Sequence, residues 1–236
     1  MRGCLTFLAT ILVVAAAVAW FLPPPVADAV LSQSLSVVLG GPMNANVRTS
    51  FPPSLLTFRA DGVDVTGSNA RFANGTLRAA TVTLHLSDVD LLARTAGAVD
   101  GTFRDVTIDT SSLGPLSVER IVLSGPSGSL DATATIDTTE GTRILAAAIA
   151  GATGRPAISV QLVPPSSAQA RVGGIPITAR LAVVNGDLVA LPGRPGIPTI
   201  VVLKASALAP FVLTGVAAQD GTLILSGHLT GAALGF

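Results

Sequence analysis

Apolar and polar residues alternate with a period of two along much of this chain, and this pattern constrains its fold most. Leu77–Leu86, Ser129–Asp137 and Ile175–Val184 all alternate, and the inward phase of the second run is Leu130, Ala132, Ala134 and Ile136. Such alternation is typical of half-buried antiparallel strands. Five Asx-Gly dipeptides lie among these runs: Asp61-Gly62, Asn74-Gly75, Asp100-Gly101, Asn185-Gly186 and Asp220-Gly221. Both residue types tolerate the positive φ of type I′ turns, so the series predicts a meander of hairpins.

Two helices are predicted beside these strands. Residues 24–40 form an amphipathic pattern with one stripe at Ala27, Leu31, Ser34, Leu35 and Val38 and polar residues opposite. Such a helix either packs against a sheet or lies on the membrane surface, and the lack of Lys and Arg to hold anionic lipid favours packing. A second helix begins after a cap at Thr138 or Thr139 and ends at Gly151 and Gly154. A helical turn is also predicted over Asp88–Ala96. The expected fold class is α+β and mostly β, with a long curved antiparallel sheet wrapped around one or two helices.

The N-terminus predicts export. Leu5–Leu22 is an uninterrupted apolar run of 18 residues behind Arg2, long enough as a helix to cross a bilayer with Arg2 on the cytoplasmic side. Residues 1–22 are therefore a transmembrane anchor or signal segment, and residues 23–236 form the exported domain. Ala27-Asp28-Ala29 has the small-x-small pattern of a cleavage site. The domain is thus either tethered to the outer face of the cytoplasmic membrane or released into the periplasm after cleavage near Ala29.

Composition excludes several classes of function. The 14 basic residues balance 14 acidic ones, which leaves no basic field for nucleic acid. The only cysteine, Cys4, precedes the apolar run, so the exported domain has no disulfide, thiol nucleophile or cysteine metal site. Aromatic residues are 4% of the chain, with no Tyr and one Trp, so small aliphatic residues must build the core.

No catalytic signature is present. The two histidines, His85 and His228, lie on the polar phase of strand-like runs, and Gly125-Pro126-Ser127-Gly128 does not fit a nucleophile elbow. No phosphate-binding glycine loop is found, and the carboxylates are scattered. The sequence therefore predicts neither an enzyme nor a bound cofactor or metal. A convergent Ser/His/Asp cluster in space would revive the hydrolase hypothesis.

Three segments of the chain contain recognisable motifs. Ala209–Leu229 has a Pro-hydrophobic strand, an Asp-Gly turn and a closing strand. Ala157–Pro192 has a Pro loop and a later hairpin, and Phe72–Leu91 has a G-x-L motif followed by a D-V-x-L motif. Together these segments resemble the LmeA-like (DUF2993) family of actinobacterial envelope proteins, with Ala209–Leu229 similar to the end of that family. The resemblance implies an elongated fold similar to half of a TULIP lipid-transfer domain, phospholipid binding and support of lipomannan assembly. It implies no catalytic residues.

The predicted function is non-enzymatic binding of phospholipid acyl chains, or of a lipoglycan precursor, in an apolar groove that supports envelope assembly. The partners are then lipid and membrane. The groove is predicted to be bordered by an uncharged helix stripe and an uncharged strand face: Ile144, Leu145, Ala148, Ile149, Ile175, Ile177, Ala179, Leu181 and Val183. The alternative is a structural or assembly protein of the envelope that binds protein partners through sheet edges. A dense aliphatic core would satisfy the same composition.

Overall fold

The structure is a computed structural model that describes residues 28–29, 32–33, 36–37, 40–49, 59–72, 76–90, 93, 95–110, 114–208 and 211–229. The predicted membrane segment Leu5–Leu22 and the Asn74-Gly75 turn lie outside the described residues. Within the described ranges, no helix is both long enough and apolar enough to span a membrane.

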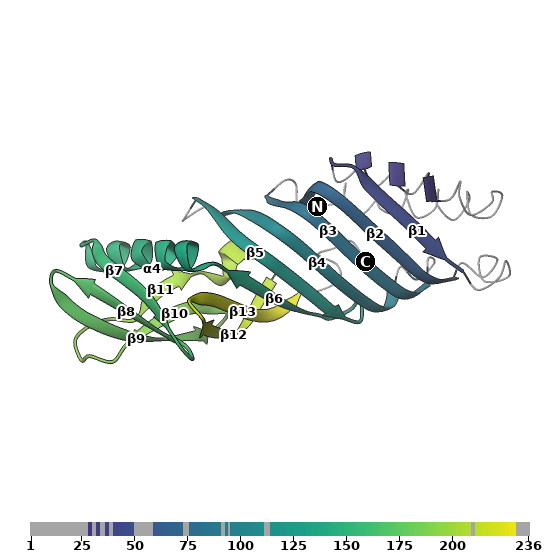
Figure 1. Ribbon diagram of the computed structural model, residues 1–236. Coiled ribbons are helices and arrows are strands. Elements are labelled where there is room, and N and C mark those ends of the chain that lie inside the picture. The colour runs from purple at the N-terminus through teal and green to yellow at the C-terminus, as the bar shows by residue number, and fades with distance from the viewer. Residues whose placement is uncertain are drawn as a thin grey trace. The chain divides into compact units, whose positions relative to one another are not determined.

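The described residues are mostly β, with strands joined into antiparallel sheets and two helices (Figure 1). In chain order the elements are β1 (Met43–Arg48), β2 (Arg59–Phe72), β3 (Leu77–Asp90), β4 (Thr95–Thr110), β5 (Gly114–Gly125), β6 (Leu130–Ile136), α4 (Thr138–Thr153), β7 (Ala157–Val163), β8 (Ser167–Val172), β9 (Ile175–Val184), β10 (Asp187–Pro192), β11 (Ile200–Leu203), α5 (Ala205–Leu208), β12 (Phe211–Gln219) and β13 (Thr222–Leu229).

The strands form an eight-stranded sheet with the order β1-β2-β3-β4-β5-β6-β13-β12 and a five-stranded sheet with the order β11-β10-β9-β8-β7. The chain divides into two compact units. The first comprises the described residues up to Val106 and Val122–Asp131, and the second comprises Thr107–Ile121 and Ala132–Leu229.

The predicted strand phases are confirmed where they are described. Leu130, Ala132, Ala134 and Ile136 are at most 8% exposed, whereas Asp131 and Thr133 between them are exposed. Two of the predicted hairpin turns are confirmed as well. Asn185-Gly186 joins β9 to β10 with φ of 52° and 81°, and Asp220-Gly221 joins β12 to β13 with φ of 49° and 81°. Both dipeptides thus supply the two positive φ angles of a type I′ turn.

The turns predicted at Asp61-Gly62 and Asp100-Gly101 are wrong, because both dipeptides lie inside long strands. Gly62 pairs with Ser87 in the β2–β3 ladder. A Cβ at Gly101 would lie 2.7 Å from Leu84 Cδ2, so this glycine serves a close approach between side chains and not a turn. The helical turn predicted over Asp88–Ala96 is also wrong, since Asp88–Asp90 ends β3 and Thr95 begins β4. Asp88 has a φ of 50° within its strand, which explains the break in the alternation.

Strand β1 is the edge of the eight-stranded sheet, and helical residues cover its backbone. The described residues of the predicted N-terminal helix, 28–29, 32–33 and 36–37, are helical. Asp28, Ser32 and Ser36 accept hydrogen bonds from the backbone N–H groups of Val47 (3.0 Å), Ala45 (2.7 Å) and Met43 (2.8 Å). The predicted packing against a sheet is therefore correct, but the polar face makes these contacts. The predicted apolar stripe of this helix lies outside the described residues.

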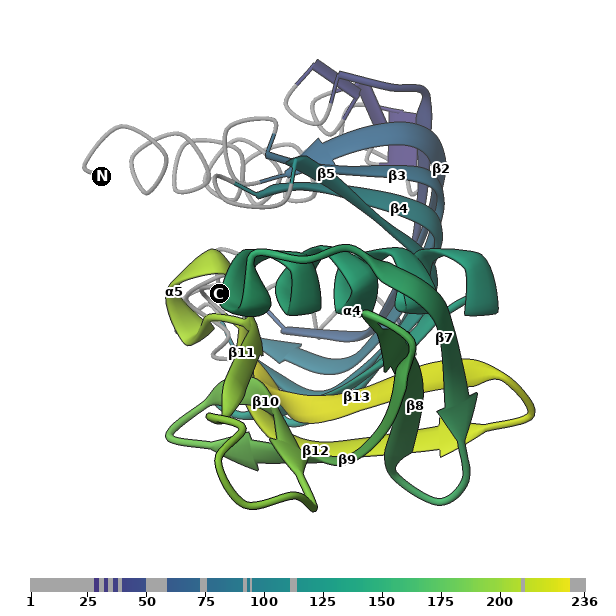
Figure 2. The ribbon, with the colours of Figure 1, turned by 90° about the vertical axis from the view of Figure 1, so that its left-hand side faces the viewer.

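In the second unit, α4 contacts both edge strands of the five-stranded sheet. It packs against β7 on one side and β11 on the other, which requires the sheet to curl (Figure 2). The cap of α4 is Asp137, not Thr138 or Thr139, since Asp137 Oδ1 accepts the N–H of Glu140 at 2.9 Å. The helix ends at Gly154, which has a φ of 67°. Ile144, Leu145 and Ile149 on its inner face are at most 8% exposed.

Candidate functional site

Strands β7, β8 and β9 present an uncharged face made of three cross-strand rows, which we name the apolar strip. The strand registers place Leu162, Ala168 and Ala179 in the first row and Val160, Ala170 and Ile177 in the second. The third row joins Val172 to Ile175. Ile158 lies next to this row, at the irregularity between Ser159 and Ala157, the register partner of Val172. All nine side chains are aliphatic, and three of them are alanine.

Exposure rises along the two outer strands of the apolar strip, β7 and β9. The first row is buried, with exposed fractions of 9%, 5% and 8% for Leu162, Ala168 and Ala179. All members of the second row are half-buried. In the third row Ile158 is 72% exposed and Ile175 is 51% exposed, whereas Val172 on the middle strand is buried. The strip thus connects the core of the second unit to its surface without meeting a charged or polar side chain.

The apolar strip faces α4. A Cβ at Gly141, in the first turn of that helix, would lie 3.1 Å from Leu162 Cδ1. The buried row therefore lies beside the start of α4, while Ile158 in the exposed row follows the end of the same helix. The short side chains of Ala168 and Ala170 leave more volume on this face than bulkier residues would. At Gly141 the side chain of Leu162 already fills the space that a Cβ would take.

The opposite face of the same strands is polar. The registers place Gln161, Gln169 and Thr178 in one row and Ser159 and Arg171 in the next. All five side chains are exposed. A sheet with one apolar and one solvated face fits the alternation predicted from the sequence. The exposed end of the apolar strip is consequently bordered by a cation, Arg171.

The structure brings together part of the predicted groove set. Ile175, Ile177 and Ala179 lie in the apolar strip, and Leu181 (2% exposed) and half-buried Val183 continue the same phase of β9. Ile144, Leu145, Ile149 and half-buried Ala148 lie on α4, which packs chiefly against β7 and β11.

Sequence reasoning missed the contribution of β7 and β8. The residues it left out are Ile158, Val160, Leu162, Ala168, Ala170 and Val172. Their signal was present, because AISVQLV and SAQARV both contain the period-two alternation.

A second cluster lies on β1, β2 and β3 of the first unit. Asp64 Oδ1 is 2.5 Å from His85 Nδ1, and Ser87 Oγ is 3.3 Å from His85 Nε2. Arg48 Nη2 lies 2.7 Å from Asp64 Oδ1 and 2.6 Å from Oδ2. The hydrogen bond from His85, followed by that from Arg48, lowers the pKa of the Asp64 carboxyl. The connectivity Asp–His–Ser is that of a hydrolase triad.

Three features of this cluster oppose catalysis. Arg48 neutralises the carboxylate that would have to stabilise an imidazolium, and its Nη2 lies only 3.1 Å from His85 Nδ1. The Ser87–His85 contact is long for a hydroxyl that must give up a proton. The side chains of His85 and Asp64 are 41% and 37% exposed, so water screens the electrostatic interactions among them. The geometry fits a polar network on a solvated sheet face.

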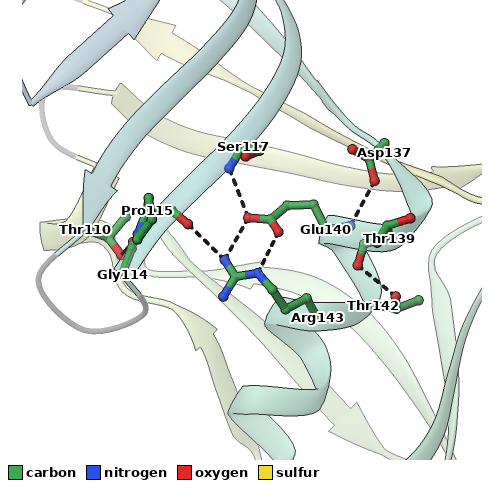
Figure 3. Close-up of polar contacts among 9 residues, drawn as sticks. All are labelled: Thr110, Gly114, Pro115, Ser117, Asp137, Thr139, Glu140, Thr142 and Arg143. Atoms are coloured by element: carbon green, nitrogen blue, oxygen red, sulfur yellow. Dashed lines mark hydrogen bonds and ion pairs between the residues drawn. The ribbon is translucent and has the colours of Figure 1, made fainter.

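A third polar cluster joins α4 to β5 and is structural (Figure 3). Glu140 accepts the N–H of Ser117 at 2.9 Å and is paired with Arg143, which also donates to the carbonyl oxygen of Pro115 at 3.0 Å. The hydrogen bond from Arg143 lowers the pKa of the Glu140 carboxyl, and the Ser117 N–H acts in the same direction. These contacts attach α4 to β5, and this structural role accounts for all of them.

Comparison with protein-family models, curated proteins and solved structures finds no match to the chain. The resemblance to the LmeA-like family therefore stays a prediction. Across the described ranges, no group of three or more His, Cys, Asp or Glu side chains is placed to hold a metal ion.

Proposed function

We propose that this protein binds the acyl chains of a phospholipid along the apolar strip, without catalysing a reaction. The observation that carries the proposal is the exposure gradient, from buried Ala168 and Ala179 to the open Ile158 and Ile175. An amphiphile needs such a path, because its chain must leave water while its headgroup stays outside. The curled sheet would then wrap around α4 as in half of a TULIP domain.

The dimensions are adequate for an acyl chain. From Ile175 to Leu181 the strand advances six residues, about 20 Å at about 3.3 Å per residue. Each buried methylene contributes about 0.8 kcal/mol, so a chain of about ten methylenes offers about 8 kcal/mol before the costs of ordering. That is sufficient for reversible binding of a single lipid.

The proposal places this activity on the outer side of the cytoplasmic membrane. The domain would be tethered there by Leu5–Leu22 or released after cleavage near Ala29, and it would support envelope lipid or lipoglycan assembly. The export signal in the sequence and the resemblance to the LmeA-like family support this location.

The alternative is a scaffold that binds protein partners through sheet edges. Two observations weigh against it. The outward N–H groups of Met43, Ala45 and Val47 on edge strand β1 already donate to helical side chains. Both edge strands of the five-stranded sheet, β7 and β11, contact α4. These edges offer less free backbone to a partner than bare edges would.

Photo-crosslinking tests the proposal. The full chain is mixed with a phosphatidylcholine that carries a diazirine in one acyl chain, and cross-linked tryptic peptides are identified by mass spectrometry. We expect cross-links in peptides 144–171 and 172–180, which contain the apolar strip. Ala170→Trp fills the middle row and should abolish them, whereas Gln169→Trp on the solvated face should preserve them. Cross-links confined to the N-terminal apolar segment would overturn the proposal.

A further inference from the structure

Positive charge dominates one segment of the second unit. Residues 154–204 carry five cations, Arg155, Arg171, Arg180, Arg194 and Lys204, against one carboxylate, Asp187, whereas the whole chain has a net charge of zero. Residues 150–186 contain no Asp or Glu. This part of the molecule therefore concentrates positive charge that the overall composition hides.

Three carboxylates of this unit lie toward the buried end of the apolar strip, where Arg143 and Arg180 are found as well. Asp137 caps the start of α4, beside the buried row. Asp187 lies opposite Val184, at the far end of β9 from Ile175, and accepts the backbone N–H of Ala205 at 2.7 Å. Asp220 precedes Gly221, where a Cβ would lie 2.8 Å from Thr138 Oγ1.

Three further arginines lie around the exposed end. Arg155 follows α4 directly and its Nη1 would lie 3.3 Å from a Cβ at Gly173, in the β8–β9 turn. Arg171 pairs with Pro176 across the same two strands. Arg194 follows the end of β10, where Gly193 donates to the carbonyl oxygen of Thr178. All three arginines are exposed.

We infer that this rim, made of Arg155, Ile158, Arg171, Ile175 and Arg194, docks on a bilayer surface that contains anionic phospholipid. Cations together with exposed aliphatic side chains match a surface that is negatively charged outside and apolar beneath. The C-terminal carbonyls of α4 add partial negative charge here, which the adjacent Arg155 offsets. The inference goes beyond the proposed function, since docking does not require a chain to enter the apolar strip.

An acidic protein surface would satisfy the arginines alone. It would not explain why two isoleucines, Ile158 and Ile175, are 72% and 51% exposed at the same end of these strands. Those side chains continue an uncharged face, so at a bilayer they would extend toward the acyl region while the guanidinium groups remain among the phosphates. The apolar component therefore favours the membrane as the partner.

A fluorophore at the rim tests the inference in the full chain. Cys4→Ser removes the only thiol. Ile175→Cys then allows an environment-sensitive nitrobenzoxadiazole group to be attached at the rim. Val184→Cys, at the other end of the same strand and 45% exposed, provides the matched control. Each labelled chain is reconstituted into liposomes of phosphatidylcholine alone or mixed with phosphatidylglycerol.

The rim fluorophore should brighten and shift to the blue only with phosphatidylglycerol, and the control fluorophore should not respond. About 1 M salt should reverse the effect, because the Debye length falls to about 3 Å. Each arginine near an anionic surface should change the docking equilibrium about fivefold, so Arg155→Gln with Arg171→Gln should reduce it about 25-fold. Arg104→Gln with Arg120→Gln removes two exposed charges from β4 and β5 and should have no effect.

Three results would overturn the inference. The rim fluorophore could give the same spectrum with both kinds of liposome, or the fluorophore at position 184 could respond equally. The variant with Arg155→Gln and Arg171→Gln could also dock as strongly as the wild type. Failure of the proposed function gives a different result. Ala170→Trp would then leave the photo-crosslinking pattern unchanged, while the rim fluorophore still distinguished the two kinds of liposome.

Discussion

The Glu140 carboxylate accepts the backbone N–H of Ser117 at 2.9 Å, so a helical side chain occupies the position of a strand partner. Strand β6 ends at Ile136 and α4 begins two residues later, while β5 starts at Gly114. Arg143 makes a second contact of this kind, because it donates a hydrogen bond to the carbonyl oxygen of Pro115. The first turn of α4 thus continues the hydrogen bonding of the sheet past the end of β6.

This arrangement predicts an acid-dependent loss of stability. The pKa of the Glu140 carboxyl in the folded protein is lowered below its usual value of 4.5, chiefly by the hydrogen bond from Arg143. A lowered pKa contributes stability that is complete above the unfolded value and is lost as pH falls through the folded value. Glu140→Gln should therefore cost about 1–3 kcal/mol at pH 7 in urea unfolding. The difference from the wild type should shrink below pH 4.5.

Glu119→Gln is the matched control, since Glu119 lies exposed on the same strand, β5. Glu119→Gln should leave the free energy of unfolding unchanged at pH 7 and also below pH 4.5. A Glu140→Gln variant whose deficit stays constant as pH falls would show that the charge of the carboxylate is unimportant.

The N-terminal helical residues likewise accept hydrogen bonds from a strand backbone, here at the β1 edge. Residues four apart on a helix are separated by about 6.0 Å, and residues two apart on a strand by about 6.7 Å. This near match lets Asp28, Ser32 and Ser36 reach alternate N–H groups of β1. The four-residue spacing of these polar side chains is visible in the sequence. Their bonding to the β1 backbone could not be predicted from the amphipathic pattern alone.

Ser32→Ala should release the backbone N–H of Ala45. The loss of one hydrogen bond should cost about 1 kcal/mol. Amide hydrogen exchange should show faster exchange at Ala45, with a smaller effect at Val47. Gln33→Ala changes the exposed neighbouring position and should leave exchange at Ala45 as it is. If the two variants exchange alike, Ser32 does not hold this edge.

Much of the second unit could be predicted from the sequence because its signals are local. The alternation in β6 and β9, the Asn185-Gly186 turn and the inner stripe of α4 all depend on residues close in the chain. The long strands β2 and β4 could not be predicted in the same way. Asp61-Gly62 and Asp100-Gly101 favour turns locally, but pairing with neighbouring strands overrides that preference.

The candidate site was predicted in part for the same reason. The uncharged phase of β9 was visible, because Ile175, Ile177 and Ala179 alternate within one strand. The apolar strip needs the registers of β7 and β8 as well, and registers depend on contacts between strands. The lack of Asp and Glu in residues 150–186 was visible in the sequence, whereas the position of Arg155 and Arg171 beside the exposed end of the strip depends on the assembled strands.

The phase of β6 predicts opposite outcomes for adjacent substitutions. Ala134 is 8% exposed and Thr133 is exposed. Ala134→Asp should bury a carboxylate and cost several kcal/mol of unfolding free energy. Thr133→Asp should change it by less than about 0.5 kcal/mol. Chemical denaturation of both variants measures the difference, and equal losses would place the sheet in another register.

The Asp64–His85–Ser87 cluster predicts an unreactive serine. Arg48 pairs with the Asp64 carboxylate through both oxygens, which leaves little negative charge to stabilise a protonated His85. We therefore expect that a fluorophosphonate probe does not label Ser87. Intact-protein mass spectrometry should show the same rate of labelling for the wild type and for a Ser87→Ala variant. Arg48→Gln tests the cause, because it frees the carboxylate while retaining His85 and Ser87. Labelling of the wild type at Ser87 that disappears in His85→Ala would instead establish a hydrolase-like site on this sheet face.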